Sequence, residues 1–173
     1  MAEPAWVRRF HATSITFPEC ARDAPHRCAY QSNASGTSEL YAWDRRRDQH
    51  ARLTDRPEGT RLGRITPDGE WVWWFDDTNG DECGRWMRQQ FDVLTGDAQP
   101  EPAVPELAPG YPVGLALGRT LAAIGLSTRD GVSVYLHRYG SSTTTVYAAT
   151  RHASVRSLSH DETLVRDRAL RAR

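Results

Sequence analysis

Three adjacent residues, Ser159, His160 and Asp161, are of the types that form the catalytic triad of serine hydrolases. A triad passes a proton along a line of three side chains, whereas neighbouring side chains of an extended chain point to opposite faces. The Gly-x-Ser-x-Gly sequence that presents a nucleophilic serine on a strained turn occurs nowhere in the 173 residues. We therefore expect no catalytic residue in this chain and interpret Ser159-His160-Asp161 as a turn.

A calcium loop is the second chemistry that the residue types suggest. Asp77, Asn79 and Asp81 have the spacing of its first ligands, but Glu82 stands where such a loop needs Gly, and Arg88 stands where it needs Glu. We interpret this segment as the tip of a hairpin.

Cysteine and histidine could also bind a metal near the N-terminal end of the chain. Cys20, His26 and Cys28 lie close together in the sequence, but no fourth ligand has a suitable spacing. With Cys83 the chain has three cysteines, an odd number without Cys-x-x-Cys spacing, so we expect free thiols rather than a disulfide framework. We expect no metal site.

A phosphate loop is weakly suggested by Gly114 to Thr120. Only three residues separate its two glycines, and Arg119 occupies the position of the required lysine. All 22 basic residues are arginine, which also excludes a Schiff-base lysine. We expect no cofactor, and no substrate-binding residue can be named from the sequence.

Charge and hydropathy give no reason to expect nucleic acid or a membrane as a partner. The 22 basic and 22 acidic residues balance. The arginines at 45–47 and 166–173 are typical of a solvated hairpin end and a solvated tail. No apolar run approaches the roughly 18 residues that span a bilayer, and the first ten residues carry arginines where a signal peptide needs its apolar core. We expect a cytoplasmic protein.

The elements that must position any site are strands. Segments 39–44, 70–75 and 132–137 are short, rich in aromatic and β-branched residues, and bounded by turn residues. The run Trp71 to Phe75 is apolar on both alternating faces, so we expect other layers to cover both sides of this strand. Trp71, Trp73 and Trp74 then belong to the core, while Trp6 lies ahead of the strands, where it could dock on another domain.

The strand pattern repeats with a period of about 45 residues, which is typical of a four-stranded propeller blade. Gly36 corresponds to Gly80, Tyr41 corresponds to Tyr135, and the turn Thr66-Pro67-Asp68-Gly69 corresponds to Ser159-His160-Asp161-Glu162. The repeat predicts an all-β fold, a partial β-propeller of about three four-stranded antiparallel blades.

The predicted organisation is an N-terminal extension over 1–19, a partial propeller over 20–165 and an Arg-rich tail over 166–173. Blades are expected near 20–66, 67–112 and 113–160. The proline-rich segment 98–112 is predicted to be an extended connector. Residues 114–126 fit either a helical stripe or strands, and the register of the repeat favours strands. Because propellers typically need at least four blades, three leave open edges.

Segments 22–44, 53–55 and 65–77 carry a family resemblance, which extends over roughly residues 20–160. They resemble the N-terminal β-propeller of bacterial prolyl oligopeptidase family serine peptidases, with the acylaminoacyl-peptidase and dipeptidyl-aminopeptidase-like branch nearest. The Pro-Asp-Gly turn with a following apolar strand is shared by TolB-like and other propellers. Cys83 departs from the pattern in the second copy, Leu117-Gly118 replaces a Pro-Asp-Gly turn, and Arg166-Asp167 interrupts an expected apolar strand.

The resemblance implies a partner, a C-terminal α/β-hydrolase domain that supplies the nucleophile and is absent from these residues. It also implies a role, which is to cover the active site of a peptidase and restrict access to short peptides or small amides. An alternative hypothesis is a free-standing TolB-like or WD40-like scaffold that binds a peptide or protein and self-associates through its open blade edges. A truncated remnant without a function of its own is a third.

Overall fold

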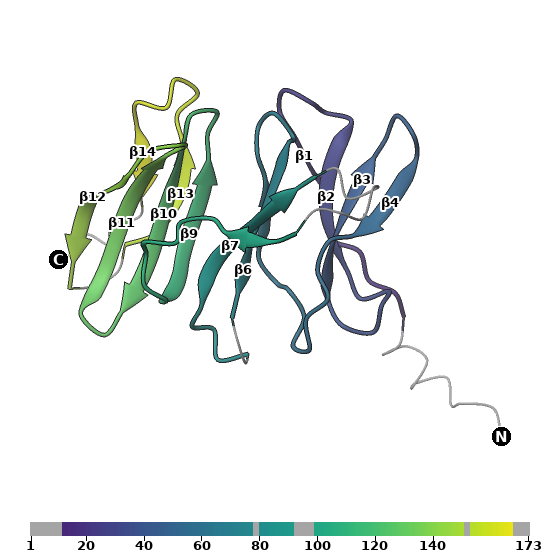
Figure 1. Ribbon diagram of the computed structural model, residues 1–173, viewed down its shortest axis with the longest axis horizontal. Helices are drawn as coiled ribbons and strands as arrows, with labels where there is room; N and C mark the ends of the chain where they lie inside the picture. The colour runs from purple at the N-terminus through teal and green to yellow at the C-terminus, as the bar shows by residue number, and fades with distance from the viewer. Residues whose placement is uncertain (1–11, 78–79, 92–98, 151–152, 168–173) are drawn as a thin grey trace.

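The computed structural model describes residues 12–77, 80–91, 99–150 and 153–167, and throughout these ranges the chain is β-structure joined by turns and loops (Figure 1). Trp6, Asn79 and the tail residues 168–173 lie outside the described residues. No helix in the described part of the chain is long and apolar enough to cross a membrane.

Three four-stranded antiparallel sheets follow one another along the chain, each with its strands in sequence order. The first sheet contains β1 (Glu19–Cys20), β2 (Arg27–Ser32), β3 (Glu39–Asp44) and β4 (Gln49–Arg52). The second contains β5 (Gly63–Ile65), β6 (Trp71–Asp76), β7 (Arg85–Gln90) and β8 (Glu101–Pro102). The third contains β9 (Tyr111–Leu117), β10 (Leu121–Thr128), β11 (Gly131–Arg138) and β12 (Thr143–Ala149). A hairpin of β13 (Val155–Leu158) and β14 (Val165–Asp167) comes last.

The predicted fold class is confirmed, because the sheets are three four-stranded meanders of the expected size, standing side by side in Figure 1. The blade boundaries differ from the predicted ones. Strands β5 and β13 lie at the ends of the predicted ranges 20–66 and 113–160, and β9 crosses the predicted boundary at residue 112, but each begins the next sheet. The turn that recurs in the sequence joins the first strand of a sheet to the second rather than one sheet to the next.

Strand β6 is buried on both faces, as its sequence predicts. Val72 and Trp74 pack into a core shared with the first sheet, which includes Leu40 and Ala42. The alternate residues of the strand, Trp73 and Phe75, pack into a second core shared with the third sheet. The middle sheet therefore joins the other two through apolar contacts on opposite sides.

Residues 114–126 form parts of β9 and β10, so the strand interpretation is confirmed. Ala122 and Ile124 belong to the core against the second sheet, whereas Ala123 belongs to a core with Val155 of the final hairpin. This alternation has the period of two that defines a strand.

The proline-rich segment 98–112 is more structured than the predicted connector. Glu101 and Pro102 form β8, the outer strand of the second sheet, where a proline is tolerated because no further strand needs its missing N–H. Ala103 and Val104 then bury their side chains in the second core.

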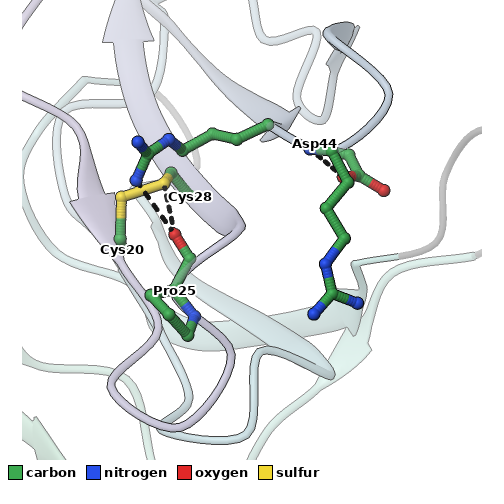
Figure 2. The surroundings of a disulfide bond; sticks show 6 residues. Cys20, Pro25, Cys28 and Asp44 are labelled. Atoms are coloured by element: carbon green, nitrogen blue, oxygen red, sulfur yellow. Dashed lines mark hydrogen bonds between the residues drawn. A yellow bond between two sulfur atoms is a disulfide. The ribbon is translucent and has the colours of Figure 1, made fainter.

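The expectation of three free thiols is wrong for two of them. Cys20 and Cys28 form a disulfide, shown in Figure 2, while Cys83 is free. The two cysteines are directly paired across the antiparallel strands β1 and β2, with their Cα atoms 3.9 Å apart. The sequence shows their separation of eight residues but not the register, which the loop between the strands sets. The Pro25 carbonyl oxygen in this loop accepts a hydrogen bond from Arg45 Nη1 at 3.3 Å.

Replacing Trp73 with alanine is expected to lower the free energy of unfolding by about 3–5 kcal/mol, because a buried ring is removed from tightly packed surroundings. Trp73 is 1% exposed. The matched control is Trp71→Ala in the same strand, where the ring is half-buried and stacked beneath the Arg88 guanidinium. Unfolding in guanidinium chloride, followed by tryptophan fluorescence, measures the loss in free energy of unfolding for each variant. Equal losses in the two variants would contradict the burial of β6 on both faces.

Candidate functional site

The first strands of consecutive sheets lie side by side and form one wall. Strand β1 contacts β5, β5 contacts β9, and β9 contacts β13. These four strands, with the turns that follow β1, β9 and β13, line a pocket of about 230 Å³. First strands of neighbouring blades surround the central axis of a propeller, so this pocket occupies the position of a propeller channel. We call it the channel pocket.

Five charged residues line the channel pocket. Glu19 of β1 and Arg64 of β5 form an ion pair, with 3.4 Å between Arg64 Nη1 and Glu19 Oε2. Partial burial raises the pKa of Glu19, although the nearby Arg64 guanidinium opposes the shift. Arg22 and Arg156 also line the pocket. The arrangement can bind a charged group, and no histidine is among the described residues that line it.

An ion pair between Asp23 and Arg119 links the first sheet to the third at the turn end of the pocket. Arg119 Nε and Nη2 each donate a hydrogen bond to Asp23, both at 2.8 Å. These bonds hold the pKa of Asp23 below its usual value. The Asp23 backbone N–H also donates to the Pro67 carbonyl at 2.8 Å. The β1–β2 loop therefore contacts the corresponding turns of both following sheets.

Glu162 fixes the final hairpin to the same region. Its carboxylate accepts hydrogen bonds from the backbone N–H of Arg119, and from the backbone N–H and hydroxyl of Thr120 at 3.1 and 2.6 Å. Partial burial opposes ionisation, but these bonds keep the pKa of Glu162 below its usual value. A Cβ at Gly118 would lie 2.6 Å from the Glu162 carboxyl carbon, so a larger residue there would displace the Glu162 side chain.

Ser159, His160 and Asp161 form a turn of the same construction as Thr66 to Gly69. Ser159 Oγ donates to Asp161 Oδ1 at 2.6 Å and accepts from the Leu164 N–H at 2.9 Å. In the earlier turn, Thr66 Oγ1 donates to Asp68 and accepts from the Trp71 N–H. The bonds from Ser159 and Thr163 lower the pKa of Asp161 to about 2. The serine and the aspartate are thus joined directly, with no histidine between them.

Gly114 to Leu117 lie in β9, where residues 115–117 line the channel pocket, and Arg119 follows in the β9–β10 turn. Cys20 and Cys28 are joined to each other, so neither thiolate is available to a metal. Within the ranges that the structure describes, no group of histidine, cysteine, aspartate or glutamate side chains could hold a metal ion.

Sequence reasoning missed an aromatic cluster on the face of the first sheet that points away from the second. Its members are Tyr30, Tyr41, Trp43 and His50, in which the Tyr30 hydroxyl lies 3.0 Å from His50 Nδ1 and Trp43 stacks on His50 with centroids 5.3 Å apart. They alternate with Ala29, Leu40 and Ala42 of the core, a signal that the sequence does contain. The tyrosines and Trp43 are only half-buried. We call this surface the aromatic face.

Comparisons with known proteins find similar folds among solved structures. No family model matches the chain, and no curated protein matches it. Among solved structures, a prolyl endopeptidase superposes with a TM-score of 0.63 at 15% identity over 91% of this chain and 26% of its own. Prolyl oligopeptidase B from Galerina marginata gives 0.60 at 11% identity over 87% of this chain and 26% of its own. A chain in the mitotic checkpoint complex gives 0.52 at 11% identity over 88% of this chain and 44% of its own.

The sheet order and these superpositions agree on the class of fold. The described chain has a β-propeller fold, with three four-stranded blades followed by a two-stranded hairpin. It spans about a quarter of the length of the two peptidases. At these identities the likeness concerns the fold alone.

The Asp23 to Arg119 ion pair is expected to contribute to stability as a unit. Asp23→Asn and Arg119→Gln should each lower the melting temperature, and the double variant should lose little more than either single variant. Because the folded protein holds the pKa of Asp23 below its ordinary value of 3.8, the contribution is present above that pH and is lost as the pH falls further.

Thermal unfolding of the four proteins at neutral and acidic pH measures both effects. Asp130→Asn, in the β10–β11 turn, is the control for loss of an exposed carboxylate. Fully additive losses at neutral pH would show that the two side chains do not act together.

Proposed function

We propose that this chain is the non-catalytic propeller portion of a serine peptidase and limits which substrates reach the active site. The observation that carries the proposal is the channel pocket, a pocket with charged residues in its wall where four first strands meet. A pocket of about 230 Å³ has room for a short extended segment but not for a folded chain. Short peptides and small aminoacyl amides are the substrates of that size.

Two further observations support this proposal. The sequence resembles the propellers of prolyl oligopeptidase family enzymes, and the fold superposes on a prolyl endopeptidase and on a prolyl oligopeptidase. Both proteins are about four times as long as the matched region, which leaves room in them for further domains. In the proposal, the nucleophile and its base belong to an α/β-hydrolase domain outside these 173 residues. No cofactor, nucleic acid or membrane takes part.

The aromatic face favours a second candidate function, a propeller scaffold that binds a peptide or protein. Tyr30, Tyr41 and Trp43 offer amphipathic rings that are only half-buried. Aromatic rings of this kind are enriched at protein interfaces. Such a scaffold would bind its partner without hydrolysing it, and its copies would associate through the open blade edges.

The cytoplasmic location that the sequence suggests stays a prediction. The Cys20 to Cys28 disulfide is a reason to test it, because disulfides persist in oxidising compartments and are rare in the cytosol.

The proposed function is tested on the endogenous protein. An antibody against residues 19–167 captures it from the source cells, mass spectrometry gives its mass, and a fluorophosphonate probe reports a reactive serine. A species several-fold heavier than 19.5 kDa that reacts with the probe is expected, and heat denaturation before labelling is the control. A 19.5 kDa species without labelling would contradict the peptidase and leave the scaffold.

A further inference from the structure

Arg22 lines the channel pocket and forms only a long ion pair. Its Nε lies 3.7 Å from Asp23 Oδ1, which is within ion-pair distance but too far for a hydrogen bond. Both Asp23 oxygens already accept hydrogen bonds from Arg119. The Arg22 side chain is 45% exposed, so its guanidinium is accessible from the pocket.

Arg156 of β13 also lines the pocket, and the residue is exposed. Glu162 lines the pocket too, but its oxygens accept bonds from Arg119 and Thr120. Glu19 is paired with Arg64. Both carboxylates that line the pocket therefore already have partners, while the exposed guanidinium groups of Arg22 and Arg156 are accessible to a ligand.

Leu117 and Leu158 add apolar surface to the same pocket. A ligand that fits this arrangement carries an anionic group for the arginines and an apolar group for the leucines. Guanidinium matches carboxylate through paired N–H donors. An inorganic phosphate could meet the arginines, but it would leave the leucine surface unused.

We propose that the channel pocket binds the terminal carboxylate of a peptide through Arg22 and Arg156, with the last side chain against Leu117 and Leu158. The inference rests on the proposed function for the kind of ligand, since a propeller that admits short peptides meets their free ends. The site would select peptides by their C-terminal end and hold that end in the channel.

The test is a titration of the 173-residue chain followed by two-dimensional NMR of its backbone amides. The probes are N-acetyl-Ala-Leu with a free carboxylate, the same peptide with a C-terminal amide, and inorganic phosphate. The carboxylate peptide is expected to shift the amides of Ser157 and Leu158, to bind at least about tenfold more tightly than its amide, and to bind more weakly as salt is added.

Arg156→Gln and Arg22→Gln are each expected to weaken binding about tenfold, the loss typical of one charge-assisted contact. Arg129→Gln, at an exposed position in the β10–β11 turn, is the matched control and should bind as the unchanged chain does. Matching melting temperatures establish that the variants fold. The proposal would be overturned if the peptide acid and its amide bound equally well, or if both pocket variants bound the peptide acid as tightly as the unchanged chain does. It would also be overturned if inorganic phosphate bound and the peptide acid did not.

The outcomes separate this inference from the proposed function. If the carboxylate peptide binds through Arg22 and Arg156 but the endogenous protein has no reactive serine, the peptidase is refuted and the carboxylate site stands. If the serine is present but the peptide acid binds no better than its amide, the site alone is refuted.

Discussion

Strand β6 presents large side chains to both faces of its sheet, so each face must be covered to keep aromatic rings out of water. Trp74 and Val72 are covered by the first sheet, and Trp73 and Phe75 by the third. Burial of apolar area is the main favourable term in folding, and burying one large side chain contributes about 1.5–3 kcal/mol. Removing either neighbour would expose half of this strand, so the three sheets stabilise one another.

This two-sided packing also sets the position of the functional region. Stacking the sheets face to face brings their first strands together, because each sheet begins with the strand on the same side. The channel pocket follows from that geometry rather than from any single motif. The turns at its end are then joined by polar contacts, with Asp23 bound to Arg119 and Glu162 bound to Thr120. Through these contacts both carboxylates already accept hydrogen bonds from the third sheet.

The fold was accessible from the sequence, whereas the site was not. Two features of the sequence predict the fold. The run Trp71 to Phe75 is apolar on both alternating faces, and the strand pattern repeats about every 45 residues. The structure contains both. The register of β1 against β2 depends on a loop whose shape no local pattern specifies, which is why the cysteine pairing was missed.

The channel pocket combines residues from four strands far apart in the sequence. Arg22 and Arg156 belong to no common sequence motif. They line one pocket only because the sheets pack against one another. The aromatic face is an intermediate case, because Tyr30, Tyr41 and Trp43 alternate with core residues but only the sheet order shows that no described layer covers them.

Hydrogen exchange of the backbone amides tests the central role of β6 most directly. The account predicts that amides of β6 exchange most slowly and open together with those of β2 and β10; exchange in β6 as fast as in the edge strand β12, or separate opening of the three sheets, would contradict it.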